Sequence, residues 1–186
     1  MTEVNSSDLD SAVKDVLQSI NGIDSLYPAQ YELLHSLLNN ENLFYTNSTN
    51  SGKTLPVVIY PQILRSLNKL GYKFPSQPKV LFVTALNSLK LSLVNNVKSL
   101  GLDAEAVTSE NLQDLLSSDT STLFISPEVF KLPAVTKILL QHRSAFVLKC
   151  VDEAHLGKDL KQWCPLIILY SKGHTILILV NVAMSL

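Results

Sequence analysis

The segment LFYTNSTNSGKT, residues 43–54, decides the fold of this chain. A short apolar and aromatic run leads into a polar loop that ends in Gly52, Lys53 and Thr54, and a stretch of helical periodicity comes next. A strand, a loop and a helix in this order turn backbone N–H groups toward an anion at the helix N-terminus. We therefore predict a phosphate loop. The alternative is an ordinary surface turn rich in serine, threonine and asparagine.

The loop matches the second half of the pattern G-x-x-x-x-G-K-[ST], and Asn47 stands at its first glycine position. Lys53 is expected to reach the β- and γ-phosphates, and Thr54 to place its hydroxyl on Mg²⁺. Asn50 stands where glycine would be comfortable, and asparagine tolerates a left-handed backbone better than most residues. We expect Asn50, Ser51 and Gly52 to line the phosphates.

A pair of adjacent carboxylates follows an apolar run about a hundred residues later, in Val151-Asp152-Glu153-Ala154-His155. Two neighbouring carboxylates repel each other unless a cation or separate environments relieve them. Asp152 is expected to hold the Mg²⁺ shell, and Glu153 to orient or deprotonate the attacking water. The alternative is a helix N-terminus, where acidic residues are favoured anyway.

Apolar β-branched runs alternate with segments of helical spacing along the chain. This alternation predicts parallel βαβ units and a doubly wound α/β sheet. We expect Ser109 to cap one helix and Pro61 to bend another. The expected strands cover residues 43–45, 80–84, 104–107, 122–125, 145–151 and 175–181, and the expected helices cover 13–20, 28–38, 54–70, 89–100, 111–116 and 129–140.

Ligands of such sheets bind outside the carboxyl ends of the strands. Four polar segments of this chain fall there: residues 46–54, the residues from Thr84 onward, residues 126–128, and Asp152-Glu153. One topology therefore gathers them on one edge. Lys149 departs from the pattern, because a strand buried on both faces is expected to be apolar there.

Composition narrows the class of protein. The chain has 186 residues, 46% of them hydrophobic and 17% charged, which suits one globular α/β domain. A net charge of −1 favours no particular partner. The polar start predicts no signal peptide, the two cysteines are typical of reduced intracellular thiols, and the interrupted apolar tail is too short to span a membrane.

Taken together, these motifs resemble those of superfamily 2 helicases. Residues 152–155 resemble the DEAH box, and the loop keeps Thr49, Gly52, Lys53 and Thr54 of that superfamily's form A-x-T-G-x-G-K-T. Leu26-Tyr27-Pro28-Ala29-Gln30 is similar to the adenine-reading motif of RecQ-type DNA helicases, with Tyr27 in place of arginine. The resemblance implies ATP and Mg²⁺ as cofactors, with Thr49 in the phosphate loop and Gln30 on the adenine.

Residues 83–89 and 125–128 resemble the strand-end motifs with which these helicases touch single-stranded DNA. The resemblance implies contacts from Thr84, Ser126 and Pro127, with RNA as the alternative partner. It also implies a RecA-like P-loop domain with a three-layer α/β/α arrangement and a mostly parallel sheet. In the family, 3′-to-5′ unwinding needs a second RecA-like domain that carries an arginine finger, and these residues contain none.

The resemblance divides the chain into an N-terminal helical arm (1–22), a helicase ATP-binding domain (23–165) and a divergent apolar tail (166–186). It implies an ATP-dependent DNA helicase that acts within a larger assembly, in the nucleus or the cytoplasm. A non-catalytic nucleotide- or nucleic-acid-binding module is the alternative. An inactive helicase fragment is a further alternative. The third hypothesis is a gene-model fragment that never folds stably, because its sheet lacks the last strands.

Overall fold

Six parallel strands form the central layer of this protein. The structure, a computed structural model, describes residues 4–39, 42–47, 51–84, 87–152 and 175–181. The strand order is β1-β6-β5-β2-β4-β3, and every pairing is parallel. The strands are β1 (Leu43–Asn47), β2 (Lys79–Val83), β3 (Ala104–Ala106), β4 (Thr122–Ile125), β5 (Phe146–Val151) and β6 (Thr175–Asn181).

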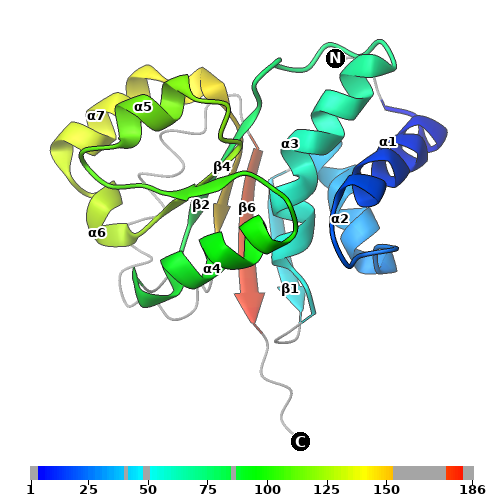
Figure 1. Cartoon of the computed structure of the whole chain (residues 1–186), viewed down its shortest axis with the longest axis horizontal. Coiled ribbons are helices and arrows are strands. Elements are labelled where there is room, and N and C mark those ends of the chain that lie inside the picture. The colour runs from blue at the N-terminus through cyan, green and yellow to red at the C-terminus, as the bar shows by residue number, and fades with distance from the viewer. Residues whose placement is uncertain (1–3, 40–41, 48–50, 85–86, 153–174, 182–186) are drawn as a thin grey trace, which may run out of the picture.

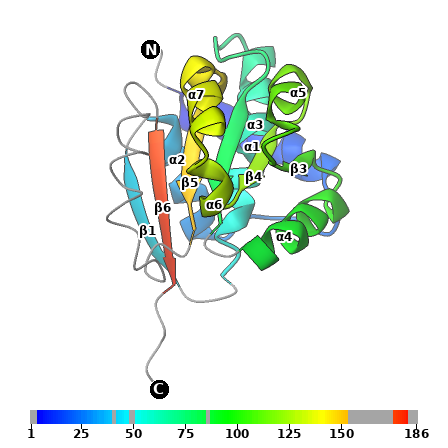
Figure 2. The same cartoon turned by 90° about the vertical axis from the view of Figure 1, so that its left-hand side faces the viewer.

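Helices cover both faces of the sheet, which gives the three-layer α/β/α arrangement of a RecA-like domain (Figures 1 and 2). The first four pack with one face and the next three with the other. They are α1 (Ser6–Ser19), α2 (Pro28–Leu38), α3 (Thr54–Lys69) and α4 (Asn87–Ser99) on one side, and α5 (Leu112–Ser117), α6 (Pro127–Phe130) and α7 (Pro133–Gln141) on the other.

Strand β2 illustrates why the chain forms a sheet that is buried on both faces. Val80 and Phe82 point into the first core, whereas Leu81 and Val83 point into the second, as the two-residue period of a strand requires. The ring of Phe82 lies 5.0 Å from that of Phe124 on β4. An apolar β-branched run therefore encodes a central strand that helices cover on both sides.

Helix α1 is attached to the first core by polar contacts as well as apolar ones. The carboxylate of Asp15 accepts hydrogen bonds from Ser66 Oγ (2.7 Å) and Lys69 Nζ (3.1 Å), both on α3. Asp8 accepts a third from the Tyr72 hydroxyl at 2.8 Å. These contacts lower the pKa of Asp15, because its hydrogen-bond donors favour the charged form. The arm therefore packs as part of the domain core.

Two local predictions were wrong. The helix expected over residues 129–140 is split into α6 and α7, because the residue before Pro133 is disfavoured in helical conformation. The expected cap Ser109 hydrogen-bonds Glu110 instead. The start of α5 is closed by Thr108 and Asn111, each of whose side chains accepts the other's backbone N–H, at 2.8 and 3.2 Å.

The strand expected over residues 175–181 is confirmed as β6, and its place in the sheet is informative. It lies between β1 and β5 and pairs with both (Figure 2). In the part of the chain that the structure describes, no helix has the length and apolar character needed to cross a bilayer.

Candidate nucleotide-binding site

The phosphate loop leads from β1 to the N-terminus of α3. Thr49 and Asn50 lie outside the described residues, and the description resumes at Ser51. Gly52 has φ +70°, a left-handed conformation that favours glycine. Lys53 then enters helical geometry at φ −53° and ψ −31°, and Thr54 begins α3. The Gly52 carbonyl accepts from Leu55 N–H at 3.1 Å, so the loop closes directly onto the helix.

The start of α3 suits a bound phosphate. The helix has 16 residues and no side-chain cap, so its dipole is directed at the loop. Of its first three residues, Leu55 already donates its N–H to the Gly52 carbonyl and Pro56 has no N–H, so the backbone donor that α3 can offer there is that of Thr54. Lys53, the residue directly before α3, is 8% exposed. The hydroxyl oxygen of Ser51 is buried without a hydrogen-bond partner among the described residues. An orphaned polar atom beside an open helix donor fits an anionic ligand.

Gln30 joins the adenine-reading motif to this loop. Its Nε2 donates to the Gly52 carbonyl at 3.0 Å and lies 3.5 Å from the Ser51 carbonyl. Its Oε1 accepts the backbone N–H of Tyr27 at 2.9 Å, which closes the first turn of α2. A Cβ added to Gly52 would lie 2.6 Å from the same Nε2. The glycine and the glutamine are therefore fitted to each other.

A cavity of about 520 Å³ opens beside this junction. That volume lies within the usual range for small-molecule sites. Four parts of the chain form its walls: the loop of residues 22–27, Gln30 with Gly52, the start of α3 and the second half of α4. Its apolar side chains are Ile23, Leu55, Val58, Leu93, Val97 and Leu100, and its polar ones are Asp24, Ser25, Tyr27, Gln30, Thr54 and Asn96.

Asn21 holds the far wall of this cavity in place. Its backbone N–H donates to the Leu100 carbonyl at 3.1 Å, and its Nδ2 donates to the Ser99 carbonyl at 3.3 Å. These are carbonyls at the C-terminal end of α4, where a helix leaves its acceptors unpaired. The loop of residues 22–27 is thus connected to α4 on one side and, through Gln30, to the phosphate loop on the other.

Asp152 lies on the same edge of the sheet as the phosphate loop. Val151 pairs with Ile178 on β6, which pairs with Phe44 on β1, so Asp152 is level with Tyr45. Two strand spacings place β5 roughly 10 Å from β1. Asp152 is half-buried, its N–H donates to Val83 at 3.0 Å, and Glu153 lies outside the described residues.

These residues fit the chemistry of magnesium. Mg²⁺ is commonly held by one or two protein oxygens together with phosphates and water. Thr54 at the start of α3 and Asp152 at the end of β5 supply a hydroxyl and a carboxylate on one edge. Within the described ranges, no group of three His, Cys, Asp or Glu side chains could hold a metal alone.

Thr84, Ser126 and Pro127 come together at the other end of this edge. Thr84 N–H donates to the Ile125 carbonyl at 3.0 Å, which places the exits of β2 and β4 side by side. The side chain of Thr84 is 1% exposed and that of Ser126 is 0% exposed, and only Pro127 is partly accessible. The sequence predicted that these residues lie at the carboxyl edge of the sheet, which the structure confirms. That their side chains are buried could not be predicted from the sequence.

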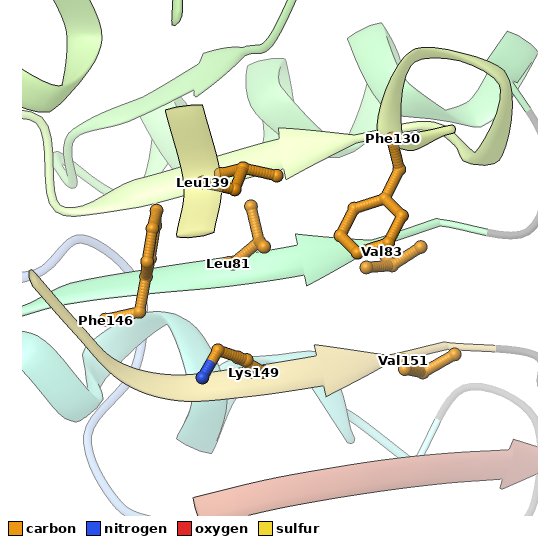
Figure 3. Close-up of a pocket in the computed structure, with 7 residues that line it drawn as sticks. All are labelled: Leu81, Val83, Phe130, Leu139, Phe146, Lys149 and Val151. Atoms are coloured by element: carbon orange, nitrogen blue, oxygen red, sulfur yellow. The ribbon is translucent and has the colours of Figure 1, made fainter. Parts of the chain in front are cut away.

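Lys149 lies on the second face of the sheet, in a small apolar pocket (Figure 3). It is 5% exposed, so the stem does not carry its amine out to solvent. Burial, with a contribution from Arg143, lowers the pKa of Lys149 to about 8. Burial also raises the pKa of the Cys150 thiol, and the charge of Asp152 adds to that effect. Neither side chain is directed at the nucleotide cavity.

Sequence reasoning missed Asn21 and Asn96, which shape the cavity from outside the recognised motifs. A signal for Asn96 was present, because Leu93, Val97 and Leu100 form an apolar helical stripe that this asparagine interrupts. Nothing in the sequence indicated that this stripe would face residues 22–25.

No family model matches the sequence, and no curated protein resembles it at a significant level. Solved structures do resemble it. The UvsW helicase of bacteriophage T4 matches with a TM-score of 0.64 and 14% identity, over 96% of this chain and 61% of that one. The helicase MrfA bound to DNA and AMPPNP matches at 0.65 and 15%, over 99% and 27%.

MrfA bound to DNA alone gives a TM-score of 0.63 and 16% identity, over 98% of this chain and 28% of that one. The chain therefore spans less than two thirds of the length of each of these helicases. At such low identity the likeness concerns the fold and not the individual residues. Combined with the all-parallel sheet and its helical layers, it shows that this protein has the fold of a helicase RecA-like domain.

Proposed function

We propose that this protein is an ATP-binding motor domain similar to the first RecA-like domain of RecQ-type DNA helicases. Three observations support the proposal: the helicase RecA-like fold, the glycine and lysine at the open start of α3, and a cavity beside them. The adenine-reading motif and the DEAH-like segment favour the RecQ type in particular.

Each site residue has a role in this proposal. Lys53, Thr49, Asn50, Ser51 and Gly52 would hold the phosphates. The metal would be held by Thr54 and Asp152, and when bound it would neutralise charge on the phosphates. The side chain of Glu153 would accept a proton from the attacking water.

The observation that carries the proposal is the hydrogen bond from Gln30 Nε2 to the Gly52 carbonyl, 3.0 Å long. It connects a motif that would recognise adenine to the loop that would hold the phosphates. The side chain of Gln30 is 3% exposed, so its amide has a fixed orientation next to the cavity. A surface turn rich in serine and asparagine would have no reason to be fixed in this way.

Binding of Mg·ATP tests the proposal directly. We expect Mg·ATP to raise the melting temperature of the protein, and Lys53→Ala to weaken ATP binding roughly 10- to 100-fold through loss of a charge-assisted hydrogen bond. Lys73→Ala removes an exposed lysine away from the cavity and serves as the matched control. The proposal fails if Mg·ATP has no effect, or stabilises Lys53→Ala as strongly as the unaltered protein.

We further propose that single-stranded DNA lies across the edge formed by the exits of β2 and β4. A helicase of this fold, MrfA, is known bound to DNA, which supports nucleic-acid binding in general. Because the side chains of Thr84 and Ser126 are buried, contacts there would come from backbone groups and from Pro127. Binding should weaken as salt rises, since phosphate contacts release counterions.

Catalysis is a separate question from binding. An arginine finger contributes on the order of 10³- to 10⁵-fold in rate, so we propose that hydrolysis and unwinding need a second RecA-like domain. The alternative is a non-catalytic module that binds nucleotide or nucleic acid without turnover. An ATPase assay of this chain with and without single-stranded DNA tests that alternative, because stimulation above background would exclude it.

A further inference from the structure

Helix α1 contributes no residue to the lining of the nucleotide cavity, yet it is connected to all three helices that do. On the side of α2, the Asp10 carboxylate accepts the Tyr31 hydroxyl at 2.7 Å. On the side of α3, Asp15 accepts Ser66 Oγ at 2.7 Å. Directly after α1, Asn21 donates hydrogen bonds to α4. One helix outside the cavity therefore holds the three helices that form its walls.

The contact between Asn21 and α4 lies where both helices end. The Asn21 backbone N–H donates to the Leu100 carbonyl at 3.1 Å, and its Nδ2 donates to the Ser99 carbonyl at 3.3 Å. Gly101 follows with φ +82°, and a Cβ added there would lie 3.7 Å from Asn21 Nδ2 and 3.9 Å from the Ser19 carbonyl oxygen. Asn21 therefore caps a helix to which it does not belong, and the backbones of the two helices approach closely at this point.

Two walls of the cavity meet at this contact. One wall is the loop that begins immediately after Asn21, and it lines the cavity with Gly22, Ile23, Asp24, Ser25 and Tyr27. The other is the second half of α4, with Leu93, Asn96, Val97 and Leu100. A nucleotide whose phosphates lie at Gly52 and Thr54 would extend its base and sugar toward these two walls. The position of Asn21 thus determines their separation without contact to the phosphate loop.

We propose that α1 and Asn21 form a clamp that sets the width of the cavity on the side of the base. Asn21 does not line the cavity, so it acts as a positioning residue and leaves the reading of adenine to Gln30. Walls that are fixed before the ligand arrives reduce the cost of ordering them on binding. This inference rests on the proposed nucleotide-binding function, and it makes that function depend on the arm of residues 1–22.

Replacement of Asn21 by aspartate tests the clamp with almost no change in size. A carboxylate cannot donate, and it would face the Ser99 carbonyl at the negative end of the α4 dipole. We expect the affinity for Mg·ATP to fall about 10-fold in Asn21→Asp and about threefold in Asn21→Ala, in which the backbone hydrogen bond remains.

A matched control separates the clamp from a general effect of charge at a helix end. Asn39→Asp introduces the same charge at the C-terminal cap of α2, at an exposed position outside the cavity lining. It should leave the affinity for Mg·ATP unchanged. If it weakens ATP binding as much as Asn21→Asp does, the clamp is wrong.

Asn21→Pro removes both donors and still suits the local backbone. Ile20 is extended, at φ −110° and ψ 150°, which is the conformation that a following proline favours. Gly22 has φ +74°, as the residue after proline has in a type II turn. We expect this variant to weaken ATP binding at least as much as Asn21→Asp, and urea denaturation confirms that each variant is folded.

The measurement is titration calorimetry with Mg·ATP and with magnesium tripolyphosphate, which has no base. Tripolyphosphate should bind the unaltered protein and every Asn21 variant with the same affinity, because the contact with α4 does not include the phosphate loop. Equal losses for the two ligands would overturn the clamp, since a merely structural role predicts them. If the unaltered protein binds ATP and the Asn21 variants bind it as tightly, the clamp is wrong and the nucleotide site stands. If the unaltered protein binds neither ligand, both proposals are overturned.

Discussion

The two ends of the sheet's carboxyl edge differ in how they could meet a ligand. At the β1 end, Gly52 is exposed, Ser51 has an orphaned hydroxyl and a cavity lies alongside. At the β2 and β4 end, Thr84 and Ser126 have buried side chains, and neither residue lines the cavity beside the phosphate loop or the pocket around Lys149. The first end can recognise a ligand through its side chains. The second can offer mainly backbone groups, which suits a partner recognised by its repeating phosphates.

Among the variants that test this contrast, replacement of Gly52 should have the largest effect on ATP binding. Gly52→Ala places a Cβ 2.6 Å from Gln30 Nε2 and strains a backbone with φ +70°. We expect it to abolish detectable ATP binding and to lower the free energy of unfolding by about 1–3 kcal/mol. Gly71→Ala is the control, because φ is +98° there and a Cβ would meet open space. Equal effects of the two variants on ATP binding would mean that the contact with Gln30 is irrelevant.

Removal of the Gln30 amide should come next in size. Gln30→Ala leaves the Tyr27 N–H and the Gly52 carbonyl without their partner, which costs on the order of 1 kcal/mol because water can reach both exposed residues. We expect weaker binding of ATP, GTP and tripolyphosphate alike, since the phosphate loop loses its support. Chemical denaturation and calorimetry measure the two effects, with the exposed Gln113→Ala as control. Unchanged binding of tripolyphosphate would contradict a role of Gln30 in supporting the phosphate loop.

The third prediction concerns Lys149 on β5, a strand that lies between the two ends of the sheet's carboxyl edge. Its pKa is lowered to about 8, so between pH 8 and 10.5 the unfolded chain holds a proton that the folded protein has released. The stability contributed by this site therefore rises with pH through that window and is lowest below pH 8. We expect Lys149→Met to gain on the order of 2 kcal/mol at pH 7 and little at pH 10.5. An equal gain at both values, from urea denaturation, would contradict burial of the charge.

The smallest expected effects come from one hydroxyl at each end. The Oγ atoms of Ser51 and Ser126 are both buried without partners among the described residues. Their replacement by alanine breaks no hydrogen bond within the described residues, so it should not lower the free energy of unfolding. Ser51→Ala should weaken ATP binding about fivefold through loss of one hydrogen bond, whereas Ser126→Ala should not change it. If calorimetry finds the reverse, the two ends have been assigned the wrong way round.

The sheet was predictable because its signals are local. The run at residues 80–84 is apolar and β-branched, which specifies a buried strand without reference to the rest of the chain. The break between α6 and α7 could also have been predicted from local sequence, because Pro133 marks it. The helical periodicity of residues 129–140 continues across the proline, however, and predicted a single helix.

The candidate site was predictable only in part, because its parts come from distant segments. Motif spacing indicated Gln30 and the phosphate loop, but not that the Gln30 amide is bonded to the backbone of Gly52. The cavity wall on α4 depends on tertiary packing, which no local pattern reports. Lys149 shows the same limit, since its position in a strand predicted burial but not the apolar pocket around it.

The position of β6 has a consequence for how the protein folds. Strand β1 pairs only with β6 in the sheet, and the Ile176 N–H bonds to the Asn42 side chain across 134 residues of sequence. Contacts of such long range form late, since the chain must first give up the entropy of closing that loop. During synthesis the strand that leads into the phosphate loop lacks its partner strand among the described ones until residues 175–181 emerge. The nucleotide site is thus expected to be among the last parts to become ordered, and a ligand that binds it would favour completion of the sheet.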